Sequence, residues 1–422
     1  MKCDAAAGPR PGSLNACPRI LIALFCFLFS LLPLSGLDFK PPSLLEPLLA
    51  SAPEIVSQAA VLADAETGTV LYSKNPGEKI PPASLTKLMT MHLVFREIDS
   101  GRASPDEIVP IGVESWAQSQ PRGSSLMFLA PGQIVTLREI LLGMAVSSGN
   151  DAAVAAALRL APSVPDFADI MTREARRMGM AVTSFVEPSG VSEDNITTAA
   201  EYAEFSREYL RLHPQALEEY HSVREFAYPK AENVAEAFRD RPNTIKQPNR
   251  NNLLYTFPGV DGLKTGYIIE SGYNIVLTAE RGGTRFIAVI LGAPSRPGGD
   301  RIRDRDGERL LSWAFENFQT VRPATAPPET ARLWKGKEKY ARLVPTAPLS
   351  FTSPAGRAAA LAYTAEVDNP LLAPLPAQFP AGWLVISDNE GELHRVRLVT
   401  EKEYQRGNIF RRIWDSIRLF FI

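Results

Sequence analysis

The chain has 422 residues, 45% of them hydrophobic, enough to bury one large core and a smaller second one. Its 45 basic residues nearly balance 47 acidic ones, and a formal charge of −2 gives no basic footprint for nucleic acid. All three cysteines, Cys3, Cys17 and Cys26, lie near the N-terminus, which excludes disulfides and thiolate metal sites from the rest of the chain.

Residues 1–36 are predicted to be a signal peptide. Basic residues, the last of them Arg19, precede an apolar run from Ile20 to Leu34, and the small residues Ser35 and Gly36 follow it. The run is short for a membrane span, although an uncleaved N-terminal anchor is the alternative interpretation. In either case we expect the rest of the chain to be exported.

Two hairpin patterns bracket a long segment that is otherwise helical. The strand-like runs are Ala59–Asp64 with Thr69–Ser73, and Asn274–Ala279 with Arg285–Leu291. The helical runs are Thr136–Val146, Asp151–Leu160, Asp166–Met178 and Arg303–Phe318. We therefore predict an α+β domain over residues 52–320, in which an antiparallel sheet is assembled from both ends of the segment around a helical region.

The composition changes after this domain. A proline-rich stretch, residues 321–330, cannot continue a helix and predicts a linker. Beyond it, strand-like runs separated by Gly, Pro and Asn predict a small all-β domain over residues 331–402. These runs are Ala331–Trp334, Leu361–Val367, Trp383–Ser387 and Leu393–Thr400.

Residues 404–422 predict an amphipathic helix. Its apolar residues repeat at helical spacing, opposite arginines, at Phe410, Ile413, Trp414, Ile417, Phe420 and Phe421. An aromatic stripe flanked by arginines can lie in the headgroup region of a membrane without spanning it. The alternative is a terminal helix docked on its own β domain.

Ser84 and Lys87 stand three residues apart at a predicted helix start, directly after Pro82 and Ala83. Positions with this spacing share a helical face, so the hydroxyl and the amine can meet. A lysine kept neutral by burial could take the serine proton and later return it to the leaving group. Alone, the pair is more typical of a serine N-cap beside a solvated lysine.

Two further segments carry polar groups suited to the same site. Ser148 and Asn150 lie in a Ser-Gly-Asn sequence between two helical runs, where a loop could project into a cleft or could simply join the helices. Lys264, Thr265 and Gly266 precede a strand pattern, and the lysine would supply positive charge for an anionic substrate group.

The three motifs occur in the order found in penicillin-binding proteins and class A β-lactamases. The chain resembles the low-molecular-mass D-alanyl-D-alanine carboxypeptidases (serine peptidase family S11) over residues 52–320, with weaker similarity to its end. The segments that carry the resemblance are Pro82–Thr90, Gly123–Leu129, Ser148–Ala152 and Val260–Tyr267. Ser-Gly-Asn, in place of Ser-Asp-Asn, is the form these carboxypeptidases typically show.

The resemblance implies a β-lactamase/transpeptidase-like fold and hydrolysis of a D-Ala-D-Ala terminus through an acyl-enzyme. The implied nucleophile, base and proton relay are Ser84, Lys87 and Ser148. The implied substrate-binding residues are Asn150, Lys264, Thr265 and Gly266, and the backbone N–H groups of Ser84 and Tyr267 would bind the oxyanion. The implied partners are peptidoglycan stem peptides and β-lactam antibiotics, with no cofactor and no metal.

The same resemblance implies an arginine near the substrate carboxylate and a location outside the cytoplasm. Counting back from the paired leucines 310–311 places the arginine at Arg303, although Arg296 and Arg301 stay open because the preceding loop looks long. Relatives often carry histidine in place of Asn195, and we expect no loss of activity from this departure. We expect a periplasmic protein, peripheral on the outer face of the cytoplasmic membrane.

Several alternative functions remain. A β-lactamase needs a second base, and the nearest candidate, Glu187, lacks the asparagine four residues on, since that position is Val191. A non-catalytic sensor of wall peptides would not need all the catalytic residues that are present. Endopeptidase action on cross-linked peptidoglycan is not separable by sequence. The four histidines form no Ser-His-Asp setting or metal pair, and we interpret them as structural.

Overall fold

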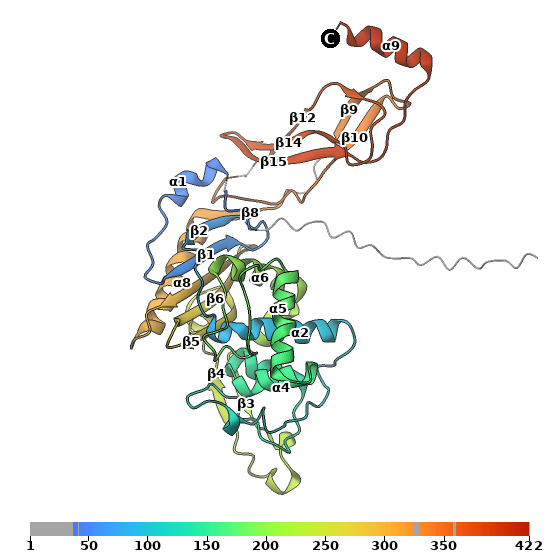
Figure 1. The fold of residues 1–422 in the computed structure, drawn as a ribbon. Coiled ribbons are helices and arrows are strands. Elements are labelled where there is room, and N and C mark those ends of the chain that lie inside the picture. The colour runs from blue at the N-terminus through green and yellow to red at the C-terminus, as the bar shows by residue number, and fades with distance from the viewer. Residues whose placement is uncertain (1–36, 41, 324–328, 358–359, 422) are drawn as a thin grey trace, which may run out of the picture. The chain divides into compact units, whose positions relative to one another are not determined.

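The computed structural model describes residues 37–40, 42–323, 329–357 and 360–421 (Figure 1). The predicted signal peptide and residues 324–328 of the predicted linker lie outside the described residues. In the described ranges, no helix combines the length and the apolar character that are needed to cross a lipid bilayer.

An antiparallel five-stranded sheet joins the two ends of the segment that covers residues 52–320, as predicted. Its strand order is β2-β1-β7-β6-β5. The strands are β1 (Ala59–Asp64), β2 (Val70–Lys74), β5 (Val260–Ile268), β6 (Gly272–Arg281) and β7 (Thr284–Ala293). Strand β1 pairs with β7 from Ala59 opposite Leu291 to Asp64 opposite Phe286, which brings the early and late strands side by side (Figure 1).

Each face of this sheet packs against different helices, because alternate residues of a strand point to opposite faces. Leu62 belongs to the buried cluster that contains Leu311 of α8 (Gly299–Asn317). Its neighbour Val61 belongs to the cluster that contains Leu88 of the helical region. Since both faces are covered, strand β1 is buried along its whole length.

The helical region contains five of the longer helices. They are α2 (Thr86–Asp99), α3 (Leu137–Leu142), α4 (Asn150–Leu160), α5 (Val164–Arg177) and α6 (Ala199–Leu212). Helix α3 ends before the predicted Val146, since the chain continues as a π-helical turn. Helix α6 lies outside the predicted runs, although Thr198 and Glu201 have capping-box spacing and Thr198 Oγ1 accepts the Glu201 N–H at 3.2 Å.

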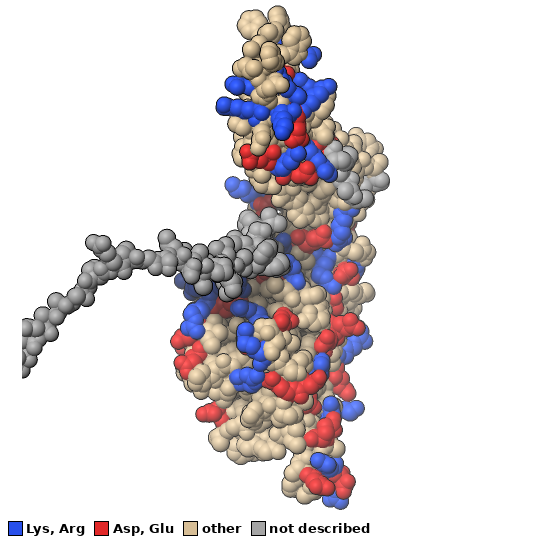
Figure 2. Space-filling model, turned by 90° about the vertical axis from the view of Figure 1, so that its right-hand side faces the viewer, with Lys and Arg blue, Asp and Glu red and all other residues tan. Residues whose placement is uncertain are grey.

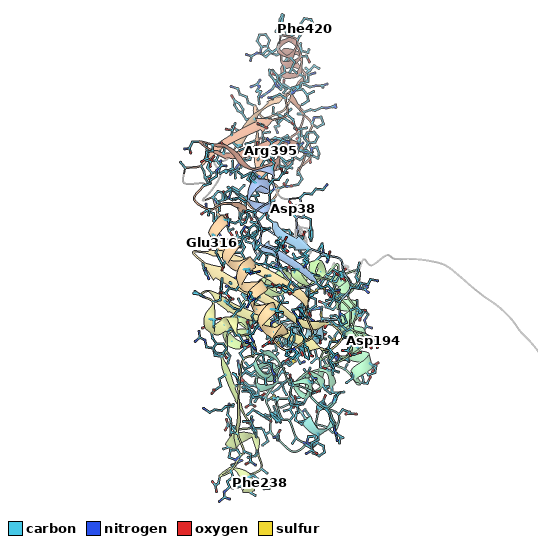
Figure 3. The ribbon with its side chains drawn as sticks, turned by 90° about the vertical axis from the view of Figure 1, so that its left-hand side faces the viewer. Asp38, Asp194, Phe238, Glu316, Arg395 and Phe420 are labelled. Carbon is cyan, nitrogen blue, oxygen red and sulfur yellow. The ribbon has the colours of Figure 1, made fainter. Side chains whose placement is uncertain are left out.

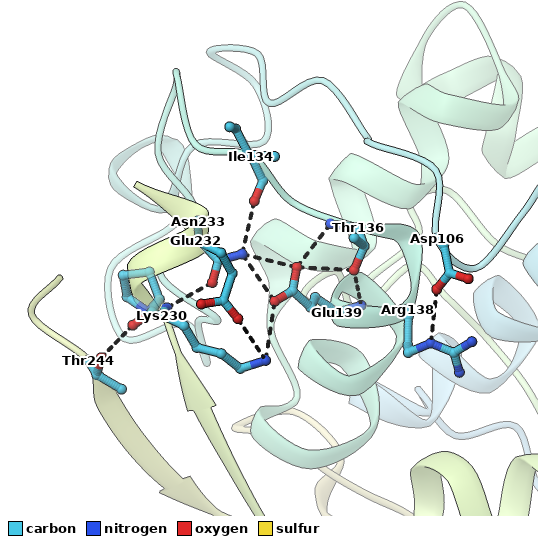
Figure 4. A network of polar contacts seen from close by, with 10 residues as sticks. Asp106, Ile134, Thr136, Arg138, Glu139, Lys230, Glu232, Asn233 and Thr244 are labelled. Atoms are coloured by element: carbon cyan, nitrogen blue, oxygen red, sulfur yellow. Dashed lines mark hydrogen bonds and ion pairs between the residues drawn. The ribbon is translucent and has the colours of Figure 1, made fainter. Parts of the chain in front are cut away.

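A polar network fixes the segment between β3 (Glu225–Tyr228) and β4 (Ile245–Pro248) against the start of α3 (Figure 4). The side-chain amide of Asn233 donates to both carboxylate oxygens of Glu139 at 3.0 Å. It also donates to the backbone oxygen of Ile134 at 2.9 Å. Since Glu139 is buried, these bonds satisfy a carboxylate that would otherwise destabilise the fold.

The C-terminal domain is all-β, as predicted, and its strands begin earlier than predicted. Strand β8 (Phe318–Val321) begins before the predicted linker and pairs with β11 (Phe351–Pro354). Strand β9 begins inside that linker. A six-stranded sheet has the order β12-β14-β15-β10-β9-β13. Its strands are β9 (Glu329–Trp334), β10 (Tyr340–Pro345), β12 (Ala362–Val367), β13 (Leu371–Leu372), β14 (Pro380–Asp388) and β15 (Gly391–Thr400).

The C-terminal helix is shorter than the predicted range of residues 404–422. Helix α9 covers Ile409–Leu419 and begins after the N-cap Asn408. Tyr404 belongs instead to the core of the β domain, where it is 1% exposed and its hydroxyl accepts the Arg342 N–H at 2.7 Å.

Candidate active site

Ser84 lies in a short 3₁₀ turn, Ala83–Leu85, which leads directly into α2. The turn places Lys87 in the first turn of α2, and the Lys87 amine nitrogen lies 2.9 Å from the Ser84 hydroxyl oxygen. Tyr202 of α6 stabilises this turn, because its buried hydroxyl donates to the Leu85 backbone oxygen at 2.5 Å. The spacing predicted from the sequence therefore corresponds to a direct contact.

The Lys87 amine is fully buried and has two further acceptors. It donates to the side-chain oxygen of Asn150 at 2.7 Å and to the backbone oxygen of Ser189 at 2.6 Å. Burial is the largest influence on this amine and lowers the pKa of Lys87 to about 7. A neutral amine can donate to these two acceptors and still offer its lone pair to Ser84.

Ser148 sits at a backbone position that few side chains adopt. It follows the π-helical turn Gly143–Ser147 and has φ of 59°, in the left-handed region. Both features concentrate at functional sites, because the surrounding structure must hold them in place. The result here is that the Ser148 hydroxyl faces Lys264, whose amine donates to it at 2.9 Å.

Asn150 is tied to the segment that precedes α3 in sequence. Its side-chain amide donates to the Ser124 hydroxyl at 3.1 Å, and its backbone N–H donates to the Ser125 oxygen. The neighbouring Asp151 carboxylate accepts three consecutive backbone N–H groups, from residues 127 to 129. These bonds explain why Gly123–Leu129 and Ser148–Ala152 both carry the resemblance: they form one unit beside Lys87.

Strand β5 passes close to the serine turn. A Cβ placed on Gly266 would lie 2.9 Å from the Pro82 oxygen and 3.0 Å from the Ser84 backbone nitrogen, so the strand approaches this closely only without a side chain there. Thr265 is buried and the following Tyr267 is 45% exposed. The strand thus brings its backbone beside the Ser84 N–H.

Lys264 lies among other positive groups. Burial, followed by the charges of Lys87, Arg250 and Arg303, lowers the pKa of the Lys264 amine well below its usual value. An incoming carboxylate would reverse part of this effect, because an opposite charge favours the protonated amine. The site is therefore suited to an anionic group.

The structure distinguishes the candidate arginines. Arg303 is buried on α8, donates to its neighbour Asp304 at 2.6 Å and acts electrostatically on Lys264. Arg296 and Arg301 are exposed. Arg250 has no place in the sequence prediction, yet its Nε donates to the Ser147 backbone oxygen at 3.2 Å and its charge acts on Lys87 as well as Lys264.

The loop after α5 also contacts the Lys87 amine, through the Ser189 backbone oxygen. Glu187 stands in this loop, and its carboxylate accepts hydrogen bonds from the loop itself, including the N–H and hydroxyl of Ser189 at 2.7 and 2.6 Å. The Asn195 side chain bonds the same carboxylate and the Thr86 hydroxyl. Glu187 therefore forms a turn, as its sequence suggests, and the loop that contains this turn contacts α2.

Three of the four histidines, His92, His213 and His221, are buried, and His394 on β15 is partly exposed. His92 contacts Glu174 and His213 through its two ring nitrogens, each at 2.9 Å. His221 contacts the Tyr209 hydroxyl at 2.7 Å. Within the described ranges, no group of three or more His, Cys, Asp and Glu side chains is placed to hold a metal ion.

A serine bonded to a buried lysine, with Ser-Gly-Asn at the start of α4 and Lys-Thr-Gly on β5 beside it, defines a penicillin-interacting serine acyl-transferase. Comparison with known proteins identifies the family within this class of enzymes. The sequence pattern of the D-alanyl-D-alanine carboxypeptidases, peptidase family S11, matches residues 47–295, and that of the penicillin-binding protein 5 C-terminal domain matches residues 315–406. The chain belongs to this carboxypeptidase family.

Individual relatives agree. The chain is 33% identical over 392 residues to the D-alanyl-D-alanine carboxypeptidase DacC of Escherichia coli K12, covering 91% of this chain and 93% of that protein. It resembles the crystal structure of penicillin-binding protein 5 from Haemophilus influenzae, with a TM-score of 0.73, 29% identity and coverage of 84% and 99%. Penicillin-binding protein D2 from Listeria monocytogenes, in its ampicillin-bound form, has a TM-score of 0.52, 29% identity and coverage of 62% and 100%.

Proposed function

We propose that this D-Ala-D-Ala carboxypeptidase removes the terminal D-alanine of peptidoglycan stem peptides through an acyl-enzyme on Ser84. Lys87 takes the Ser84 proton as the oxygen attacks the penultimate D-alanine carbonyl, and the amine of the last D-alanine leaves with a proton. Water then hydrolyses the ester and regenerates the serine. The observation that carries the proposal is a fully buried amine 2.9 Å from the Ser84 oxygen.

The remaining roles follow from position. The Ser84 and Tyr267 backbone N–H groups would stabilise the oxyanion, a placement supported by the close approach of Gly266 to Ser84. Asn150 would bind the substrate backbone.

The substrate carboxylate would meet a positive group of residues. Lys264 and Thr265, with Arg303 behind them, would bind this carboxylate. Ser148, bonded to Lys264 at 2.9 Å, would relay the proton toward the leaving amine.

Penicillin would acylate the same serine, because it presents a reactive carbonyl and a carboxylate to the same oxyanion and cation groups. A β-lactamase function is not supported. Glu187, the nearest candidate base for rapid deacylation, has its oxygens engaged by Ser189, Gly190 and Asn195. Slow release of the penicilloyl group is therefore expected.

The experiment is to incubate residues 37–422 with a peptide ending in D-Ala-D-Ala and to measure free D-alanine. Release of D-alanine supports the carboxypeptidase, whereas penicillin acylation without release would favour the sensor. Digestion of cross-linked wall fragments in parallel tests the endopeptidase alternative, because a cross-linked fragment presents a bulkier leaving group to the same cleft.

The pH dependence of acylation offers a direct check on Lys87. Since burial lowers the pKa of this amine to about 7, it is protonated below that pH and cannot accept the serine proton. The second-order rate of penicillin acylation is expected to fall as the pH drops through about 7 and to be flat just above it. A rate that stays constant down to pH 5 would contradict Lys87 as the base.

Helix α9 contacts the β domain through its polar side. Asp415 is 1% exposed, accepts the Lys335 backbone N–H at 2.7 Å and faces the Arg332 guanidinium at 3.2 Å. Arg411 donates to backbone oxygens of the β9–β10 turn. The helix therefore does contact its own β domain, as in the alternative interpretation, and it does so through polar side chains.

The aromatic stripe of α9 is consequently left exposed. Phe410 is 81% exposed, Trp414 62% and Phe420 86%. Figure 3 labels Phe420 at the outer end of the helix, and Figure 2 shows uncharged residues gathered at this end with basic side chains beside them. We infer that α9 lies in the surface of an anionic membrane, which would place the exported enzyme at the outer face of the cytoplasmic membrane.

Two variants test the membrane contact. A chain ending at Asn408 keeps the buried Tyr404 and is expected to lose binding to anionic phospholipid vesicles, as measured by cosedimentation. Trp414→Ser should weaken binding by roughly tenfold or more, because burying one aromatic side chain contributes about 1.5–3 kcal/mol. Phe238→Ser removes a 64% exposed aromatic elsewhere and serves as the control. Undiminished binding by the truncated chain would contradict the proposal.

A further inference from the structure

Glu187 is the acidic group that organises the loop beside the catalytic lysine. In addition to its bonds from Ser189, its carboxylate accepts the Gly190 N–H at 2.5 Å and the Asn195 amide at 2.9 Å. These donors come from both ends of a short loop that reaches the surface at Asp194, labelled in Figure 3. The Glu187 carboxylate thus connects the two ends of this loop by hydrogen bonds.

The loop that contains Glu187 contacts the segment from Ala83 to Lys87 at three places. The Ser189 backbone oxygen accepts a hydrogen bond from Lys87 at 2.6 Å, and Asn195 bonds the Thr86 hydroxyl at 3.2 Å. A Cβ on Gly190 would lie 1.8 Å from the Ala83 backbone oxygen, so the two backbones are in contact. A loop that opened would therefore withdraw one of the three polar partners of the Lys87 amine.

The charge of Glu187 also acts on Lys87. The negative groups that act on this amine are Glu187 and Asp151, in that order, and the positive group is Arg250. Lys264 lies close enough for its pKa to be lowered by Lys87. Asp151 is engaged by three backbone N–H groups of the neighbouring segment, whereas Glu187 belongs to the loop that bonds Lys87 directly.

We propose that Glu187 is a positioning residue for acylation: its carboxylate holds the Ser189 oxygen on the Lys87 amine, and its charge sets the pH at which acylation begins. The inference rests on the proposed role of Lys87 as base. The proposal assigns a role to a carboxylate whose oxygens are occupied by hydrogen bonds within the loop. The negative charge of Glu187 opposes the effect of the Arg250 charge on the buried Lys87 amine.

The test is Glu187→Gln, with penicillin acylation measured from pH 5 to 9. Glutamine keeps one acceptor oxygen and the side-chain length but removes the charge. Because Glu187 raises the pKa of Lys87, its loss lowers that pKa further. The acid limb, the part of the pH profile in which the acylation rate falls with falling pH, is therefore expected to move to lower pH by roughly one unit. The plateau rate is expected to fall up to about tenfold, because the loop loses some of its hydrogen bonds.

Glu201→Gln is the matched control. The Glu201 carboxylate also accepts backbone N–H bonds from a loop, at Val182 and Thr183, both at 2.7 Å, and it stands on α6. This variant is expected to keep the wild-type acid limb. Glu187→Asp, which retains the charge, is expected to keep the limb near its wild-type position even if the plateau falls.

An acid limb that coincides in the wild type and Glu187→Gln would overturn the inference and would leave Glu187 as a structural loop residue only. That outcome is distinct from failure of the proposed function. If the wild-type enzyme carries no penicilloyl group on Ser84 by peptide mass spectrometry, the acyl-enzyme proposal itself fails, whatever the variants show.

Discussion

Replacing Ser84 with alanine is expected to lower kcat/KM for D-alanine release by roughly four orders of magnitude or more, as losses of catalytic serines do in other hydrolases. The change removes the atom that forms the acyl-enzyme, and among the described residues the other two hydrogen-bond partners of the Lys87 amine are carbonyl oxygens. The measurement is D-alanine release under substrate-limited conditions, with labelling by fluorescent penicillin as a second readout.

The neighbouring Ser147 provides the control for Ser84. It is buried close to the site, but its hydroxyl donates to the Gly143 backbone oxygen at 2.9 Å and belongs to the structure of the π-helical turn. Ser147→Ala is expected to retain labelling and most of the activity. Stable labelling of Ser84→Ala, with the modified peptide located elsewhere in the chain, would contradict the assignment of the nucleophile.

Lys87→Met is expected to lower the acylation rate by roughly 10³-fold, within the range typical of a lost general base. Methionine nearly fills the lysine volume, but its thioether sulfur is not basic enough to take the Ser84 proton. The change also leaves the Asn150 side-chain oxygen and the Ser189 backbone oxygen without the donor they have now. Each such loss costs about 1–3 kcal/mol, partly offset because a buried amine is removed.

Lys87→Arg separates base catalysis from simple positive charge. A guanidinium keeps its charge at every accessible pH and can still donate hydrogen bonds, but it cannot accept the Ser84 proton. Acylation is therefore expected to stay low, with no rise around pH 7. Thermal unfolding of both variants shows whether the fold persists. Near wild-type acylation by Lys87→Arg would mean that Lys87 acts through its charge alone.

The sequence predicted the chemistry of the site because that chemistry needs fixed residue types at short spacing. Ser84 and Lys87 had to lie on one helical face, and they do. Ser148 and Lys264 belong to motifs recognisable by composition and order, and the two side chains meet at 2.9 Å. The antiparallel sheet followed from hairpins whose turn residues and alternating apolar residues are local signals.

Other features could not be predicted, since they depend on contacts between distant segments. Arg250 carries no motif of its own and reaches the site because the strand β4 ends beside Ser147. Glu187 resembles an ordinary turn residue until its loop is seen to bond Lys87 through Ser189. The sequence does not determine which side of α9 faces the β domain, and the buried Asp415 shows that it is the polar side.

The sequence by itself thus determined the reaction class: the nucleophile, its amine partner and the flanking motifs are set by residue identity and local spacing. Only the tertiary structure decided how basic that amine is. Burial of Lys87 lowers its pKa to about 7, and the nearby charges of Glu187, Asp151 and Arg250 adjust it. Desolvation and electrostatic interaction depend on distance in space, and the fold alone brings these residues together from positions far apart in the chain.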